Sequence, residues 1–366
     1  MISHIHIKGY RSLRDLRLNL SRVNVITGGN GVGKSNVYRA LALMQKMAEG
    51  SFAQSLAEEG GMPSVLWGGD WGKEPRRISW QVVHENFSYE MICGLVPTDP
   101  TDPVPTAFRT DPDIKSESIR LSEREVASRK GPMVKIRSLQ GKMEHLELPM
   151  HGPESMLSEL RDNTRYTALS AVRYSLMDWR FYHQFRSDAD SPLRRPLVGF
   201  WSPVLAHDGS NLAATLQTII ESAKCDLSAI VAEAFPDMEW SAVAGDGRFE
   251  LSLSKPGMSR SLTAAELSDG TLRYFCLVAA LLSPNPPPLV VLNEPENSLH
   301  QGLLEPLAGL IAQVPETTQI ILVTHSPILA DALEQRCEAK RIELIMEDSE
   351  TKIKEHSGKK KVWSFE

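Results

Sequence analysis

The chain has 366 residues, of which 42% are hydrophobic and 23% are charged, and its formal net charge is -6. This balance excludes a generally basic nucleic-acid-binding protein, so any contact with DNA would have to be local. The longest apolar stretches are too short for a membrane span, so no membrane partner is expected, and the 4 cysteines lack metal-site spacing. Because Met1 leads into a strand pattern without a signal-peptide pattern, we expect a cytoplasmic protein.

The beginning of the chain predicts strands, a glycine-rich loop and a helix. Alternating apolar residues predict strands over 5–8 and 16–20, and a β-branched strand over 23–27 follows them. We expect these strands to form one small sheet around the loop. The run 28–35, Gly-Gly-Asn-Gly-Val-Gly-Lys-Ser, matches the pattern G-x-x-x-x-G-K-[ST], and helical spacing predicts a helix over 36–47.

This loop predicts a cradle for the polyphosphate of a nucleotide such as ATP. Glycines let the backbone curl so that its N–H groups point inward, and the positive end of the next helix favours an anion. We expect Lys34 to contact the β- and γ-phosphates and Ser35 to bind Mg²⁺. A glycine-rich turn that merely opens a helix is the alternative. The expected nucleotide-binding residues of this loop are Gly28, Asn30, Gly31, Gly33, Lys34, Ser35 and Asn36.

The middle of the chain carries mixed signals. A hairpin is predicted over 78–83 and 87–94, and the turn-rich segment 97–105 predicts a boundary. Short charged strands are expected over 118–148, and apolar residues near helical spacing predict a helical region over 153–185. We interpret the charged and helical segments as an insertion.

Two short patterns after this region allow more than one interpretation. Aromatic and arginine residues alternate over 179–186, a pattern that can stack nucleic-acid bases. On a helix these residues divide between faces, so we expect Trp179 and Tyr182 to pack in the core. Arg194 and Arg195 lie next to prolines and are equally compatible with a solvated loop.

Strands and helices alternate toward the end of the chain, which predicts an α/β sheet. The strand predicted at 289–292 is fully apolar, and the one at 319–324 is nearly so. The expected elements are helices over 211–222, 227–235, 272–282 and 303–314 and strands near 240 and over 249–253, 289–292 and 319–324.

Polar groups follow the two apolar strands where each strand ends. Asn293 and Glu294 come after one strand, and His325 comes after the other. Ligands bind where parallel strands emerge from a sheet, so these groups should lie beside the phosphate loop. We expect Glu294 to orient or deprotonate the attacking water during ATP hydrolysis, with a turn-capping role as the alternative. His325 is expected to sense the γ-phosphate by a hydrogen bond, with a purely structural histidine as the alternative.

A second helix end also carries an anion-binding pattern. Ser268, Asp269 and Gly270 precede a buried helix whose first N–H groups favour an anion, although a plain N-cap is the alternative. One triphosphate rarely needs two helix ends from the same chain. We therefore expect Ser268 and Gly270 to bind the ATP held by a second copy.

Taken in this order, the motifs resemble the ABC-class ATPases of the RecF, SMC and OLD type, in particular the stand-alone bacterial AAA-like ATPases. The resemblance covers about 1–95 and 200–345. The matching positions are 7–13 and 24–35 for the first strands and Walker A, Asn293 and Glu294 for Walker B, 268–270 for the signature, 298–300 for the D-loop and His325 for the switch histidine.

The resemblance implies an α/β fold, namely an ABC-type P-loop NTPase head with a mixed sheet, flanking helices and two lobes around a helical and β-rich insertion. We expect lobe I over 1–96, the insertion over 97–200 and lobe II over 201–366. Such a head dimerises on ATP, so that each site combines the Walker motifs of one subunit with the signature of the other. Arg11 would match an arginine that lies near the nucleotide in relatives.

Several positions depart from the pattern of this group. Most of the wider class has Asp where this chain has Asn293, and an amide can still accept a hydrogen bond from metal-bound water but brings no charge. Asp269 stands where transporters and SMC proteins have Gly, although the stand-alone group often has Ser-Asp-Gly-Thr at these positions. The middle lacks the heptads of an SMC arm, and too few residues follow His325 for the Toprim nuclease domain of OLD proteins. No Q-loop glutamine is assigned, because Gln81 and Gln140 are unconvincing candidates.

We therefore expect a Mg²⁺-dependent ATPase whose two heads are clamped together by ATP and released by hydrolysis. Its expected roles are in DNA maintenance or anti-phage defence, with DNA as a possible partner. The alternative is a nucleotide-driven switch that regulates a partner nuclease or toxin and has little turnover of its own.

Overall fold

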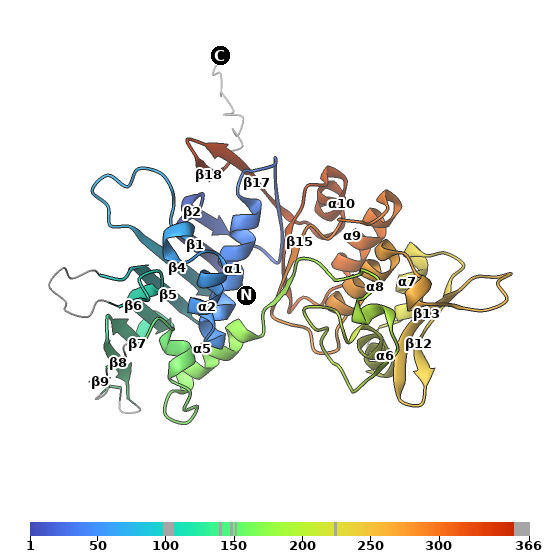
Figure 1. Ribbon diagram of the computed structural model, residues 1–366, viewed down its shortest axis with the longest axis horizontal. Helices are drawn as coiled ribbons and strands as arrows, with labels where there is room; N and C mark the ends of the chain where they lie inside the picture. Colours follow the sequence, from blue (N-terminus) through green and yellow to red (C-terminus); the bar gives the residue numbers. More distant parts are fainter. Residues whose placement is uncertain (98–105, 139–140, 147–148, 151, 223–224, 355–366) are drawn as a thin grey trace, which may run out of the picture.

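Two lobes flank a central sheet in the computed structural model (Figure 1). Gln140 and most of the expected boundary at 97–105 lie outside the described residues. The structure describes residues 1–97, 106–138, 141–146, 149–150, 152–222 and 225–354.

The first lobe is built on an antiparallel eight-stranded sheet in the order β2-β1-β4-β5-β6-β7-β8-β9. The expected charged strands, β6 to β9, extend this sheet instead of forming a sheet of their own. The expected domain boundaries at 96 and 200 stay a prediction. The strands are β1 (Ile2–Tyr10), β2 (Leu13–Asn19), β4 (Arg77–His84), β5 (Ser88–Leu95), β6 (Pro112–Leu121), β7 (Arg124–Lys130), β8 (Met133–Arg137) and β9 (Met143–His145).

Helices of this lobe pack between the eight-stranded sheet and the central sheet (Figure 1). Val37, Leu41 and Met44 recur at helical spacing on α1 and are fully buried, which stabilises the helix by removing apolar surface from water. The helices are α1 (Lys34–Glu49), α2 (Phe52–Glu58), α3 (Met62–Val65), α4 (Met156–Glu159) and α5 (Thr167–Met177).

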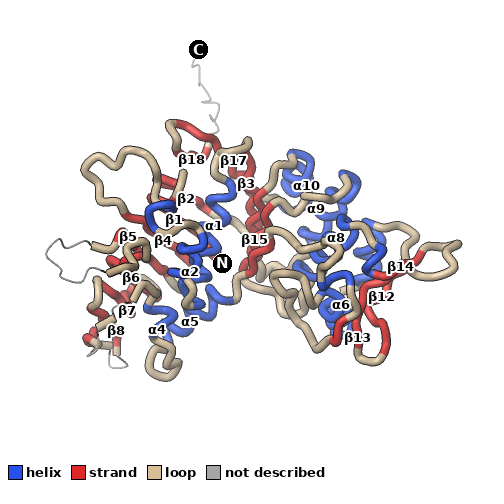
Figure 2. The backbone as a smooth tube through the Cα atoms, viewed as in Figure 1, coloured by secondary structure: helices blue, strands red, loops and turns tan. Residues whose placement is uncertain are grey.

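The central sheet, which stands between the two lobes in Figure 2, has six strands in the order β10-β15-β16-β3-β17-β18, of which the first five are parallel. Both of its faces are covered. On β15, Leu289 and Val291 belong to the core of the first lobe, whereas Val290 and Leu292 belong to the core of the second. Because the first five strands are parallel, their carboxyl ends meet at one edge of the sheet. The strands are β3 (Val23–Gly28), β10 (Arg180–Tyr182), β15 (Leu289–Asn293), β16 (Gln319–Val323), β17 (Lys340–Glu347) and β18 (Glu350–Ile353).

Two sequence predictions about strands are wrong. The strand over 23–27 does not join the first two strands, because β3 pairs with β16 and β17, where both of its faces are buried. The helical region expected to reach residue 185 ends at Met177, and 180–182 is a strand that pairs with β15. Pairing within the sheet overrides local helical periodicity there. Trp179 and Tyr182 are buried, as expected.

The second lobe contains helices packed on the central sheet and a small antiparallel sheet in the order β11-β13-β12, with β14 beside β13. The helix α10 and the hairpin of β17 and β18 are not predicted from the sequence. None of the described helices is long and apolar enough to cross a membrane. The remaining elements are β11 (Leu197–Val198), α6 (Leu212–Ser222), α7 (Leu227–Ala234), β12 (Glu239–Gly245), β13 (Arg248–Ser254), β14 (Leu262–Thr263), α8 (Asp269–Leu281), α9 (Leu304–Ala312) and α10 (Pro327–Cys337), with 3₁₀ turns η1 (Pro192–Arg194), η2 (Ala264–Glu266) and η3 (Gln301–Leu303).

Candidate nucleotide-binding site

The loop between β3 and α1 curls through left-handed backbone at its glycines. Gly28, Gly31 and Gly33 have φ angles of 148°, 76° and 98°, which favour glycine. A side chain at Gly33 is excluded for a second reason, because its Cβ would lie 2.1 Å from Thr351 Oγ1. Gly33 is also the N-cap of α1, so the first N–H groups of the helix border the loop. This is the geometry that favours a bound anion.

A cavity of about 390 Å³ lies over this loop. It brings together most of the predicted phosphate-binding residues and His325, and it adds Ser12, which the sequence analysis did not select. Gly28 is not among the lining residues and instead shapes the turn at the end of β3. The lining residues are Ser12, Asn30, Gly31, Gly33, Lys34, Ser35, Asn36 and His325.

Arg11 does not line this cavity, although its neighbour Ser12 does. Its guanidinium pairs with Glu59 at 2.6 Å, and the hydroxyl of Tyr10 donates to the same carboxylate at 2.7 Å. Arg11 therefore has a local partner and is not one of the residues that line the cavity. Its expected place near the nucleotide stays a prediction.

Lys34 is the buried cation of the loop. Its side-chain Nζ donates to the carbonyls of Gly28 and Gly29 at 2.7 and 2.6 Å, and the residue is only 4% exposed. Burial lowers the pKa of the Lys34 ammonium, while the carboxylates of Glu294 and Glu296 act in the opposite direction. The sheet thus brings these acidic groups close enough to influence the lysine.

The C-terminal hairpin holds the loop from its outer side. Thr351 on β18 is 2% exposed, and its Oγ1 donates to the carbonyl of Val32 at 2.8 Å. The same oxygen lies 2.7 Å from Ser12 Oγ, which accepts a hydrogen bond from Asn36 Nδ2 at 2.8 Å. Residues from the two ends of the chain therefore fix one loop. The sequence analysis missed this contact, because no motif marks a strand of this kind.

Asn293 ends β15 and is 2% exposed. Its amide nitrogen lies 2.5 Å from His183 Nδ1, whereas its buried Oδ1 has no hydrogen-bond partner among the described residues. A buried acceptor without a partner is unusual and fits an oxygen that receives a hydrogen bond from a ligand or water. Among the described residues, no group of three or more His, Cys, Asp and Glu side chains is arranged to hold a metal ion.

Glu294 is held on both carboxylate oxygens. Its Oε1 lies 2.9 Å from His325 Nε2, and its Oε2 accepts a hydrogen bond from Asn297 Nδ2 at 2.7 Å. The backbone at Glu294 is left-handed, with φ of 51°, and its N–H donates to the carbonyl of Val323 at 2.7 Å. A non-glycine residue in this conformation costs about 1–3 kcal/mol, and such strain is often retained where a side chain has to be aimed at a site. The structure thus brings Glu294 and His325 together.

Glu296 is a second acidic residue of this edge, which the sequence analysis did not select. Its Oε1 accepts hydrogen bonds from the backbone N–H of His325 at 2.8 Å and from the hydroxyl of Thr324 at 2.5 Å. The carboxylate therefore fixes the turn that carries the histidine. The sequence carried one sign of this role, because Glu296 lies two residues after Glu294, just beyond the end of a strand.

A second cavity, of about 290 Å³, opens where β10 and β15 end. His183 and Gln184 line it together with Asn293 and Glu294. Neither residue was predicted as part of the site, because their segment was expected to be helical. The sequence did contain a sign of a strand end here. Two apolar residues precede the polar pair His183 and Gln184, as two apolar residues precede Asn293 and Glu294. Gln81 lies on β4, which belongs to the other sheet, and is not part of this edge.

The first residues of α8 do not line the loop cavity. Ser268 is its exposed N-cap, and its Oγ accepts a hydrogen bond from the N–H of Thr271 at 3.2 Å. At Gly270 a Cβ would lie 2.6 Å from the carbonyl oxygen of Ser298, so glycine permits close packing there. Neither Ser268 nor Gly270 lines the cavity over the phosphate loop.

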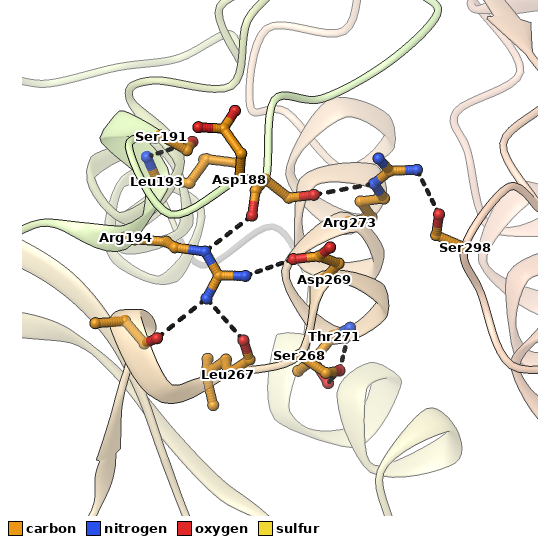
Figure 3. A network of polar contacts seen from close by, with 12 residues as sticks. Asp188, Ser191, Leu193, Arg194, Leu267, Ser268, Asp269, Thr271, Arg273 and Ser298 are labelled. Carbon is orange, nitrogen blue, oxygen red and sulfur yellow. Dashed lines mark hydrogen bonds and ion pairs between the residues drawn. The ribbon is translucent and has the colours of Figure 1, made fainter.

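Two arginines connect α8 to its surroundings (Figure 3). Arg273 on α8 donates to the carbonyl of Asn297 at 3.1 Å and to Ser298 Oγ at 2.9 Å, which ties the helix to the segment that holds Glu294. Arg194 binds the turn before the helix, and its side chain is only 12% exposed. The solvated-loop interpretation is therefore wrong for Arg194, because the turn of the second lobe folds over it.

Comparison with solved structures confirms the fold as that of an ABC-type ATPase head. The chain is similar to a structure described as the SmcHead bound to the C-winged helix domain of ScpA, with 15% identity, a TM-score of 0.54 and coverage of 96% and 97% of the two chains. It is also similar to the Smc head domain with an extended coiled coil bound to the C-terminal domain of ScpA from Pyrococcus furiosus, with 14% identity, a TM-score of 0.52 and coverage of 96% and 95%. At these identities the likeness concerns the fold alone.

Comparison with known sequences identifies the family. A curated relative, "Uncharacterized protein MJECL10" of Methanocaldococcus jannaschii, is 40% identical over 77 residues, which are 20% of this chain, and the chain spans 33% of the length of that relative. A family model described as "AAA ATPase domain" matches residues 1–85. A second family model matches residues 106–331, more than half of the chain. The chain therefore belongs to the family described as "AAA domain, putative AbiEii toxin, Type IV TA system".

Proposed function

We propose that this protein is a Mg²⁺-dependent ATPase in which ATP brings two heads together and hydrolysis releases them. One observation carries the proposal: Glu294 is held by His325 and Asn297 at the end of β15. Only β16 separates β15 from β3, the strand that leads into the phosphate loop. A fixed carboxylate beside a phosphate cradle is what water attack on a γ-phosphate requires.

The phosphate loop is proposed to bind the triphosphate of ATP. The N–H groups around Gly31 and Gly33 and at the start of α1 would donate to phosphate oxygens. Lys34 would exchange its hydrogen bonds to the carbonyls of Gly28 and Gly29 for bonds to the β- and γ-phosphates. Asn30 and Asn36 line the same cavity and would complete the cradle.

Ser35 and Asn293 are the residues proposed to hold Mg²⁺. Ser35 lines the loop cavity, and the buried Oδ1 of Asn293 is free to accept a hydrogen bond from a metal-bound water. When bound, the ion neutralises charge on the β- and γ-phosphates. Because an amide brings no charge, Asn293 should hold Mg²⁺ less tightly than an aspartate would.

Glu294 is proposed as the base that orients the attacking water, and His325 as the residue that senses the γ-phosphate. The two side chains already contact each other. A γ-phosphate that attracts the imidazole would draw it from the carboxylate and leave Glu294 Oε1 available to the water. This exchange would couple the presence of ATP to activation of the base.

Ser268 and Gly270 are proposed to bind the ATP of a second copy. Both lie at the start of α8 and do not line the cavity over the loop of the same chain, and Ser268 is exposed. The N-terminal N–H groups of a helix suit a phosphate. Arg11 is proposed to approach the nucleotide only if its pair with Glu59 opens.

The oligomeric state with a non-hydrolysable ATP analogue tests this proposal. We expect light scattering to show a monomer without nucleotide and a dimer with Mg²⁺ and analogue. Ser268→Arg should block the dimer while leaving analogue binding by the monomer unchanged, and Ser261→Arg, at an exposed serine before β14, serves as the matched control. A wild-type protein that stays monomeric with saturating analogue contradicts the shared site.

A second candidate function is a nucleotide-driven switch for a partner nuclease or toxin. The family description names a toxin and the two Smc structures carry a bound ScpA domain, which supports a protein partner in general terms.

Steady-state turnover with and without duplex DNA separates the two candidates. Strong stimulation by DNA supports a cytoplasmic enzyme of DNA maintenance or anti-phage defence. Slow turnover that is indifferent to DNA supports the regulatory switch. The net charge of -6 makes a local DNA-binding patch, not the whole surface, the region to examine.

A further inference from the structure

Arg194 binds the turn that precedes α8 through its whole guanidinium (Figure 3). Its Nη1 donates to the carbonyls of Ala264, Ala265 and Leu267 at 3.2, 3.2 and 2.8 Å. Its Nε donates to the carbonyl of Ser187 at 2.8 Å. Three carbonyls of a single turn are thus gathered by a side chain about 70 residues earlier in the chain. An arginine is suited to this because its planar guanidinium presents several N–H donors in a fixed geometry.

The remaining nitrogen of Arg194 pairs with the carboxylate of Asp269, the first residue of α8. Asp269 is exposed, whereas the side chain of Arg194 is only 12% exposed, so the positive charge lies behind the negative one. An arginine–carboxylate bond is among the stronger hydrogen bonds in proteins. The pair therefore fixes both the conformation and the net charge of this helix end.

The charge matters because of the ligand proposed for this end. A free Asp269 carboxylate beside Ser268 would repel a triphosphate and oppose the positive field of the helix N-terminus. Paired with Arg194, the same carboxylate contributes little net charge. This pairing would account for an Asp at a position where transporters and SMC proteins have Gly.

We propose that Arg194 is a positioning residue of the signature end: it fixes the turn before Ser268 and neutralises Asp269, so that α8 can accept the triphosphate of a second copy. This inference rests on the proposed function, because it assigns a role in the ATP-bound dimer. Arg194 itself is not placed in contact with the nucleotide.

A double-mutant cycle tests the inference, with Arg194→Gln, Asp269→Asn and the two combined. Dimerisation constants are measured by analytical ultracentrifugation with Mg²⁺ and non-hydrolysable analogue, and analogue affinity is measured separately on dilute monomer. We expect Arg194→Gln to weaken the dimer at least about tenfold with unchanged monomer affinity, since charge-assisted bonds are worth about that much. The combined variant should recover a large part of the loss, because the unpaired carboxylate is gone. Arg195→Gln, at a neighbouring side chain that is 60% exposed, is the matched control.

Salt distinguishes repulsion from simple loss of structure. Repulsion between Asp269 and phosphate is screened by ions, so the Arg194→Gln dimer should strengthen between about 50 and about 300 mM salt. A turn that has merely lost its shape gains nothing from salt. If Arg194→Gln does not fold, Arg194→Lys can be used in its place, because lysine keeps the positive charge without the planar guanidinium. Arg194→Lys should form the dimer with a smaller loss of affinity.

Two results would overturn the inference while the wild type still dimerises: an Arg194→Gln dimer as tight as the wild type, or a combined variant as weak as Arg194→Gln alone. A dimer of Arg194→Gln as tight as the wild type would show that Arg194 has no role in dimerisation. A combined variant as weak as Arg194→Gln alone would show that the charge of Asp269 does not matter. If the wild type itself stays monomeric, the proposed function fails and the inference falls with it. Wild-type behaviour therefore separates the two failures.

Discussion

The phosphate-loop side and the signature side of the candidate site are built in opposite ways. Lys34 is buried, and its loop is held by Thr351 from the far end of the chain. Ser268 is exposed, and it caps its own helix through a bond to Thr271. The first side is enclosed by its own chain, whereas the second faces outward.

This difference indicates which side is complete in a single chain. The phosphate loop has its cavity, its cation and its supports within one chain. The signature end has a fixed shape, set by Arg194, but its exposed Ser268 does not line the cavity over the phosphate loop. A single copy should therefore bind nucleotide, and only a second copy should make use of Ser268.

The largest expected effect is at the buried lysine. Lys34→Ala should weaken ATP binding at least about 100-fold, because it removes charge-assisted bonds to two phosphates. A fluorescent ATP analogue measures this directly. Lys46→Ala, at a 39% exposed lysine on the same helix, should bind normally. Tight binding by Lys34→Ala would contradict the assignment of the loop.

The next effect concerns turnover and not binding. Glu294→Gln should lower ATP hydrolysis roughly 100-fold or more, because an amide cannot accept the proton of water. The variant should also accumulate as an ATP-bound dimer, seen by light scattering. Glu305→Gln, at a 57% exposed carboxylate, is the control. Unchanged turnover in Glu294→Gln would refute the proposed base.

A smaller effect is expected where the hairpin supports the loop. Thr351→Val keeps the shape of the side chain but removes the hydrogen bond to Val32, at a cost of about 1 kcal/mol. We expect a lower melting temperature and about threefold to tenfold weaker nucleotide binding. Thr317→Val, at an exposed threonine, should change neither. Wild-type affinity in Thr351→Val would show that the loop holds its shape without the hairpin.

The smallest effect is expected beside the signature. The Arg260 guanidinium lowers the pKa of the exposed Glu266 carboxyl to about 2. The folded protein therefore binds this proton less readily than the unfolded chain, so the stabilisation is present above the ordinary carboxyl pKa and is lost as pH falls toward 2. Glu266→Gln should be slightly less stable than the wild type at neutral pH. Chemical denaturation should show that the difference in the free energy of unfolding becomes smaller in acid. A difference that grows in acid would contradict this.

Much of the candidate site was predictable because its signals are local. The pattern G-x-x-x-x-G-K-[ST] between a strand and a helix predicts a phosphate cradle, so Lys34 and Ser35 were selected from seven to eight consecutive residues. Glu294 and His325 were also predictable, since apolar strands that end in polar residues deliver them to one edge of a parallel sheet. The α/β class followed from the alternation of such strands with helices.

What the sequence by itself determined is therefore the set of short motifs and the kind of element that carries each. Only the tertiary structure decided which sheet β3 joins, that 180–182 is a strand which delivers His183 and Gln184, and that Thr351 and Arg194 hold the two sides of the site. The physical reason is distance along the chain. These residues are placed by pairing and hydrogen bonds with partners about 70 to over 300 residues away, and no local periodicity records such partners.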